Sequence, residues 1–211
     1  MVGSTTLPHI RLAVPDDAGA IREIYRPAIE SSVISFELDV PSEADMGTRI
    51  TETLRFHPWL VCEERGIVAG YAYATTHRVR AAYRWSVDTA VYVHDAFRRR
   101  GVGRGLYTSL FQILTAQGYV NAYAGITLPN AASVALHESV GFRPLGVYRE
   151  VGYKCGAWHD VGWWELALQP HRLDPPSPVG LQNVMSDVRR PAWLAAGCAH
   201  IRERPHDAPA V

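Results

Sequence analysis

Residues 85–117 read WSVDTAVYVHDAFRRRGVGRGLYTSLFQILTAQ, and this stretch decides the fold. It begins with the β-rich run WSVDTAVYV and ends with LYTSLFQILTAQ, whose apolar residues recur at helical spacing before Gly118. Gly101, Gly103 and Gly105 lie between the two parts, where glycine leaves backbone N–H groups accessible and a helix N-terminus favours an anion. The stretch predicts a phosphate-binding loop between a strand and a helix.

Arginine side chains surround these glycines. The chain has 21 Lys plus Arg and 21 Asp plus Glu, so its formal net charge is zero and gives no reason to expect a nucleic acid or an anionic membrane as partner. Positive charge for a pyrophosphate must therefore be local. The alternative reading is a glycine-rich turn with solvated arginines. The local candidates are Arg98, Arg99, Arg100 and Arg104.

Segments on both sides of this stretch predict further strands and helices. Helices are expected after the PDD turn at 15–17, over 42–56, and between Asn130 and Gly141. Together these elements predict an α/β domain of the α+β kind, in which the first strands pair in antiparallel fashion. Further strands are expected over 9–14, 59–64, 67–75, 121–127, 142–148 and 161–168.

The length of 211 residues fits one domain with a terminal excess. We predict a domain over 1–170 and a Pro-rich C-terminal extension over 171–211, because PPSP, RRP and RPHDAPA raise the proline content there. This extension is expected to be extended, apart from an apolar patch near 193–199.

Cysteine spacing and hydropathy bear on the cellular compartment of the protein and on metal binding. Cys62, Cys155 and Cys198 lie far apart and outside any CxxC arrangement, which favours neither a disulfide framework nor a zinc site and predicts a cytoplasmic protein. The N-terminus has no basic segment followed by an apolar one, and no run of about 18 apolar residues occurs, so neither export nor a membrane partner is expected. The fragment WHDV at 158–161 lacks further ligands at recognisable spacing, and no metal is predicted.

The order strand, RxxGxG, helix, strand and NxxSxxLHESVGF resembles the GNAT superfamily of acyl-CoA-dependent N-acyltransferases. YRWSVDTAVYV, ITLPNAASVALHESVGF and GYKCGAWHDVGWW are similar to the phosphinothricin acetyltransferase family over roughly residues 9–169. The resemblance implies a GNAT fold, which is a mixed, mostly antiparallel sheet of six to seven strands, splayed at the CoA site and flanked by helices. It also implies acetyl-CoA as co-substrate and a homodimer.

The implied activity is direct N-acetylation of a small amino-acid-like acceptor such as phosphinothricin or methionine sulfoximine. The resemblance implies that the glycine loop holds the CoA pyrophosphate, while backbone groups near Val91 and Val93 pair with the pantetheine arm. Asn130 matches a family position that contacts the cofactor, although its side chain could also cap the following helix. The full cofactor set is Val91, Tyr92, Val93, Arg98, Arg99, Arg100, Gly101, Val102, Gly103, Arg104 and Asn130.

Three residues are candidates for catalysis. The resemblance places a general base at Asp88, where glutamate is usual; aspartate is one methylene shorter and could require a water to relay the proton. It places a proton donor for the CoA thiolate at His137, where many GNAT proteins carry tyrosine, and a reacting-centre tyrosine at Tyr107. The alternatives are a hydrogen-bonding strand aspartate, a structural or exposed histidine and a buried aromatic residue.

The resemblance implies that Phe36, Arg80 and Tyr83 bind the acceptor. A guanidinium can hold a carboxylate or phosphinate through two hydrogen bonds. Phe36 resembles an aromatic residue on an acceptor-side loop, and its alternative is packing into the core. The competing functions are acetylation of a different amino acid or a polyamine, and an acyl-CoA-binding sensor with weak or no catalysis, which only the aspartate at position 88 favours.

Overall fold

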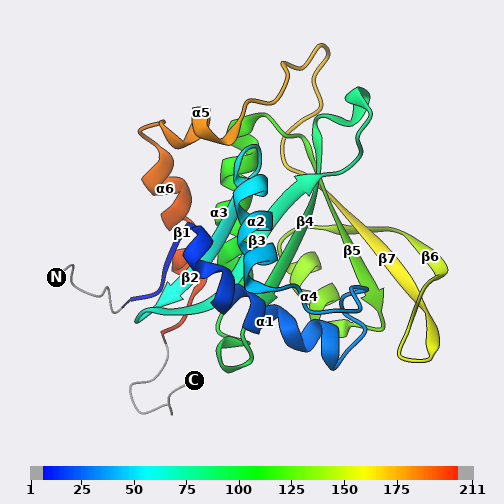
Figure 1. Cartoon of the computed structure of the whole chain (residues 1–211). Coiled ribbons are helices and arrows are strands. Elements are labelled where there is room, and N and C mark those ends of the chain that lie inside the picture. Colours follow the sequence, from blue (N-terminus) through cyan, green and yellow to red (C-terminus); the bar gives the residue numbers. More distant parts are fainter. Residues whose placement is uncertain (1–6, 204–211) are drawn as a thin grey trace.

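A computed structural model of the chain describes residues 7–203 and contains a seven-stranded sheet (Figure 1). The spatial order of the strands is β1-β2-β3-β4-β5-β7-β6. All neighbouring pairs are antiparallel except β4 and β5, which are parallel. The strands are β1 (His9–Leu12), β2 (Trp59–Glu64), β3 (Ile67–Thr76), β4 (Ser86–Val93), β5 (Asn121–Leu128), β6 (Arg143–Lys154) and β7 (Ala157–Ala167).

Strands β4 and β5 pair only at their first residues. The parallel register joins Ser86–Asp88 to residues 121–123, and the strands then separate (Figure 1). Beyond Asp88, one edge of β4 therefore has no partner strand on the β5 side. The predicted mixed, mostly antiparallel sheet that splays between two strands is confirmed.

Helices cover both faces of the sheet. One core forms between α3 (Val102–Gln117) and one face, with Leu106, Leu110 and Leu114 fully buried at the predicted helical spacing. The second core forms where α1 (Ala18–Glu30) and α2 (Glu43–Leu54) pack on the other face. The short helix α4 (Ala131–Ser139) follows β5 and lies beside the gap between β4 and β5.

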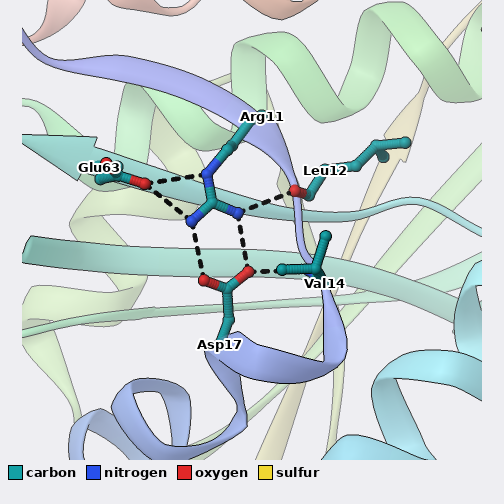
Figure 2. Close-up of polar contacts among 5 residues, drawn as sticks. All are labelled: Arg11, Leu12, Val14, Asp17 and Glu63. Atoms are coloured by element: carbon teal, nitrogen blue, oxygen red, sulfur yellow. Dashed lines mark hydrogen bonds and ion pairs between the residues drawn. The ribbon is translucent and has the colours of Figure 1, made fainter. Parts of the chain in front are cut away.

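The entry into α1 is fixed by one arginine. The Arg11 guanidinium on β1 donates to both carboxylate oxygens of Asp17 at 2.8 Å and to Glu63 on β2 at 2.8 and 2.9 Å (Figure 2). Asp17 also accepts a hydrogen bond from the backbone N–H of Val14 at 2.8 Å. Planar guanidinium groups match carboxylates in this two-bond geometry. The network ties β1, β2 and the start of α1 together and so helps to position α1.

The segment after residue 170 differs from the prediction of an extended chain. It forms α5 (Leu181–Met185), α6 (Arg190–Ala195) and a 3₁₀ turn, η4 (Cys198–His200), which pack along α3 (Figure 1). Leu181, Val184, Met185 and Trp193 are buried in the α3 core. Burial of these apolar side chains outweighs the high proline content. The domain boundary near 170 stays a prediction, and residues 204–211 lie outside the described chain.

Candidate active site

A cleft of about 610 Å³ lies where β4 and β5 separate. Its walls come from the C-terminal half of α1, the end of β4, the loop before α3 and the start of α4. Every predicted cofactor residue except Arg100 lines it. The sequence reasoning missed the walls formed by α1, by the loop that follows it and by α4, which include Pro27, Ile34 and Leu136. The predicted lining residues are Val91, Tyr92, Val93, Arg98, Arg99, Gly101, Val102, Gly103, Arg104 and Asn130.

The loop before α3 has the backbone geometry of an anion site. Gly101 is the N-cap of α3 with φ of 87°, a left-handed conformation that favours glycine. The first N–H groups of a helix have no intrahelical acceptor and carry partial positive charge. Arg98, Arg99 and Arg104 add positive charge to the same cleft. Backbone donors and guanidinium groups at one cleft suit a pyrophosphate.

Arg100 does not belong to this lining, and its assignment to the cofactor needs correction. Its two terminal nitrogens donate to the two carboxylate oxygens of buried Glu64 on β2 at 2.9 and 2.8 Å. It also donates to the carbonyl of Arg202 at 2.5 Å, and the N–H of Arg202 donates to the carbonyl of Arg100 at 2.8 Å. A buried carboxylate needs a paired cation, so Arg100 anchors the loop to β2 and to the C-terminal segment.

Asn130 caps α4 and also lies at the cleft. Its side-chain oxygen accepts from the N–H of Ser133 at 3.1 Å and caps α4, while the residue also lines the cleft. Contact with a cofactor stays a prediction.

Asp88 lies at the last paired position before the strands separate, opposite Tyr123 of β5. Its carboxylate is 2.7 Å from Nδ1 of His77, a residue just after β3 that the sequence reasoning did not select. Burial raises the pKa of Asp88, and the hydrogen bond from His77 opposes that shift. The His77 ring stacks on Tyr123 with 4.4 Å between centroids, and Tyr83 lies edge-on at 6.1 Å. Of the predicted acceptor residues, Tyr83 is thus close to the Asp88 end of the site.

Tyr107 and His137 form a separate buried pair. The Tyr107 hydroxyl is 2.8 Å from Nε2 of His137, and Nδ1 of His137 is 2.7 Å from the carbonyl of Ser133. The carbonyl can only accept, so Nδ1 carries the hydrogen and Nε2 accepts from the tyrosine. Burial lowers the pKa of His137 and raises that of Tyr107. Both nitrogens are engaged, a geometry that suits the packing alternative.

The two groups of candidate catalytic residues lie on opposite faces of β4. Val87 and Thr89 are buried, and Val87 belongs to the α3 core. Side chains alternate along a strand, so Asp88 points to the other face. Tyr107 belongs to the α3 core. The structure therefore does not bring Asp88 into contact with the Tyr107–His137 pair, and their catalytic roles stay predictions.

The loop over 31–37, expected to lie on the acceptor side, is held by a buried lysine. Lys154, at the end of β6, donates to the carbonyls of Ile29 and Ser35 at 2.7 Å each and is 6% exposed. Phe36 follows directly, and its ring lies over Gly152 of β6 and 6.4 Å from His159. Phe36 is thus on the loop that faces the β6–β7 hairpin. Arg80 is exposed and precedes the short η2 turn (Ala81–Tyr83).

Within residues 7–203 no group of three or more His, Cys, Asp or Glu side chains could hold a metal ion. No helix in that described range has the length and apolar character needed to cross a membrane.

Comparison with known proteins places this geometry in context. The family described as acetyltransferase (GNAT) domain matches residues 10–163. The phosphinothricin N-acetyltransferase of Streptomyces viridochromogenes is 39% identical over 171 residues, which cover 81% of this chain and 92% of that protein. The L-methionine sulfoximine/L-methionine sulfone acetyltransferase of Salmonella typhimurium is 36% identical over 163 residues, which cover 77% of this chain and 95% of that protein.

Solved structures agree with the sequence comparison. A GNAT superfamily phosphinothricin acetyltransferase from Sinorhizobium meliloti, determined in complex with AcCoA, superposes with a TM-score of 0.76 at 34% identity and covers 82% of this chain and 94% of that one. A putative acetyltransferase, yncA from Salmonella typhimurium, determined with acetyl-CoA, has a TM-score of 0.75 at 34% identity and covers 79% and 96%.

Proposed function

This chain belongs to the GNAT acetyltransferase family, and from that premise we propose that it moves the acetyl group of acetyl-CoA onto the amino group of a small amino-acid-like acceptor. Phosphinothricin and methionine sulfoximine are the acceptors we propose first, because the relatives at 39% and 36% identity are named for their acetylation. Acetyl transfer to an amine is the activity that the family and its curated members share.

The observation that carries the proposal is the cleft at the separation of β4 and β5. Its loop end gathers Arg98, Arg99 and Arg104 at the start of α3, which fits a pyrophosphate. From that loop, the open edge of β4 leads through Val93 and Val91 toward Asp88, so an extended amide-containing arm can pair with it. A strand rises about 3.3 Å per residue, which puts Asp88 roughly 16 Å from Val93.

The chemistry at the far end needs few groups. Bound acetyl-CoA supplies the acetyl group as a thioester. The protein must then orient a neutral amine, accept its proton and stabilise the oxyanion that forms at the carbonyl. Asp88 lies at the inner end of the open β4 edge, which supports a role for it in handling the amine proton.

On the acceptor side, we assign substrate contacts to Phe36, Tyr83 and Arg80. Tyr83 lies against His77, the partner of Asp88, and Phe36 is on the loop that Lys154 fixes. An exposed guanidinium at Arg80 suits the carboxylate or phosphinate of an acceptor. Tyr107 and His137 are kept as candidates for the proton on the departing thiolate, and their burial makes a structural role the competing explanation.

Assembly as a cytoplasmic homodimer forms part of the proposal. The β6–β7 hairpin leaves many large apolar side chains exposed, and a self-complementary contact would cover them. The three cysteines are free thiols, as expected in a reducing compartment. Light scattering coupled to size exclusion tests the dimer; a monomeric mass would contradict it. The exposed side chains are Leu145, Val147, Tyr148, Val151, Tyr153 and Trp158.

Thiol release from acetyl-CoA tests the activity. The purified chain is assayed with phosphinothricin, methionine sulfoximine, free amino acids, polyamines and a lysine peptide, with Asp88→Ala and His137→Ala in parallel. We expect release with a small α-amino acid analogue and a loss in both variants, whose folding is checked by circular dichroism. Binding of acetyl-CoA without amine-stimulated release would contradict the proposal and favour the sensor.

A matched pair of variants tests the cleft. Arg104→Ala removes a charge that lines the cleft, and Arg84→Ala removes an exposed arginine that lies against Trp85 instead. The first variant should bind acetyl-CoA more weakly, and the second should bind it like the unmodified chain. Equal affinities for the two variants would count against the assignment of this cleft.

A further inference from the structure

A histidine and an aspartate form a hydrogen-bonded pair at the point where β4 and β5 separate. Asp88 Oδ1 and His77 Nδ1 are 2.7 Å apart, and the His77 side chain is 14% exposed. Asp88 is in register with Tyr123, and the His77 ring stacks on that same tyrosine with its plane tilted by 24°. The imidazole therefore sits at the inner end of the open β4 edge.

The pairing fixes which nitrogen of His77 carries the hydrogen. An ionised carboxylate only accepts, so Nδ1 of the neutral ring is the donor and Nε2 keeps its lone pair. Among residues 7–203, no group other than Asp88 hydrogen-bonds the ring. Tyr83 and Trp163 approach edge-on at 6.1 and 6.4 Å between centroids and restrict the orientation of the ring. The arrangement is that of an oriented base.

We propose that His77 is the general base of the transfer reaction and that Asp88 is its positioning residue. This inference rests on the proposed function. It also accounts for the aspartate at position 88, because an imidazole extends the reach of a carboxylate that is too short by one methylene. The sequence resemblance assigned the base to Asp88 alone, whereas in the structure the Asp88 carboxylate is hydrogen-bonded to the His77 imidazole.

The step balances with an acceptor amine and acetyl-CoA alone. The amine nitrogen forms a bond to the thioester carbonyl carbon, and its proton passes to Nε2 of His77. The C–S bond breaks with its electron pair on sulfur, and the thiolate takes a proton that comes from solvent, directly or through the Tyr107–His137 pair. His77 returns its proton to solvent, and Asp88 stabilises the transient imidazolium.

Several charged and titratable groups surround the His77 ring. From β4 the ring meets Asp88, from η2 Tyr83, and from β5 Tyr123. Arg78, next in the chain, acts electrostatically on Asp88 and lies over Trp163 of β7 at 5.9 Å.

The test compares three variants at saturating acetyl-CoA. His77→Asn keeps a donor for Asp88 but removes the group that titrates, while Asp88→Asn removes the carboxylate. His171→Asn is the matched control, because that ring hydrogen-bonds Asn121 instead of Asp88. We expect His77→Asn to lower kcat by about 100-fold, the lower part of the range for general base catalysis. Its Kd for acetyl-CoA should stay within about twofold of the unmodified value, as for the control.

The pH profile separates the possible bases. For the unmodified chain, kcat/KM should rise with pH through the titration of the base, and His77→Asn should lose that ionisation. The proposal is overturned if His77→Asn keeps both the kcat of the unmodified chain and the fall of kcat/KM at low pH, while Asp88→Asn loses both. In that case Asp88 is itself the base. If the unmodified chain shows no amine-dependent thiol release, the proposed function itself fails. Failure of the His77 proposal is a different outcome, in which the unmodified chain is active and His77→Asn keeps its kcat.

Discussion

Replacing Lys154 by methionine should destabilise the protein by more than the replacement of a charged residue on the surface would. Its Nζ donates to the carbonyls of Ile29 and Ser35 at 2.7 Å each, from a buried position. Ile29 is in the last turn of α1, where carbonyls have no intrahelical donor. Each hydrogen bond from a charged donor contributes about 1.5–3 kcal/mol. Because the variant no longer has to bury an ammonium group, part of this loss is recovered, and the expected net destabilisation is about 2–4 kcal/mol.

Urea unfolding followed by tryptophan fluorescence measures this difference. For a chain of this length, 2–4 kcal/mol corresponds to a fall in Tm of about 4–16 °C. The control is Arg149→Met on the same hairpin, which removes an exposed ion pair with Asp160 and should cost less than about 1 kcal/mol. The KM for the acceptor should also rise in Lys154→Met, because Phe36 follows Ser35. Equal destabilisation of the two variants would refute the reasoning.

Three other changes test separate parts of the structure. Arg100→Met removes the two hydrogen bonds that the guanidinium donates to the buried carboxylate of Glu64 and should cost about 3–5 kcal/mol in thermal unfolding; a loss below 1 kcal/mol would contradict the pairing. Tyr107→Phe removes the donor to buried His137 and should cost about 1–3 kcal/mol in urea. Burial lowers the pKa of His57 from 6.5 to about 4, so the unfolded chain binds more protons between those values and stability falls as the pH drops through them. In His57→Gln, the loss of unfolding free energy over this pH range should be smaller by on the order of 2–3 kcal/mol. An unchanged pH dependence would show that another group causes the loss.

The cofactor cleft could be predicted because its chemistry is local in sequence. A glycine loop between a strand and a helix needs no distant partner to present its N–H groups, and Gly101 and Gly103 line the cleft as expected. Arg100 could not be separated from Arg98 and Arg99 in the same way. Its partner, Glu64, lies 36 residues away on β2, and only the fold brings the two together.

The helices after residue 170 were not predicted, because the high proline content there favours an extended chain and outweighed the spacing of the apolar residues. Leu181, Val184 and Met185 have the i, i+3, i+4 pattern of a helix, and all three are buried. That pattern was present in the sequence and could have identified α5. The prolines fall mainly in the connection before it.

His77 had no signal of its own in the sequence. It becomes informative only through the antiparallel register of β3 and β4, which sets Thr75 opposite Asp88 and brings the residue two further on within reach of the carboxylate. A one-residue shift in that register would turn Asp88 to the opposite face. Strand pairing, which one sequence does not determine, therefore decides which side chains meet at the candidate catalytic end of β4.

Lys154 is the only lysine in the chain, and the fold hides it. Apart from the amino terminus, amine-reactive dyes therefore have one target, which they reach only when the loop over 31–37 detaches from β6. The rate of dye attachment then measures how often the acceptor side opens, at a single site and without an engineered probe. The same feature leaves this acetyltransferase without an exposed lysine that its own acetyl donor could modify.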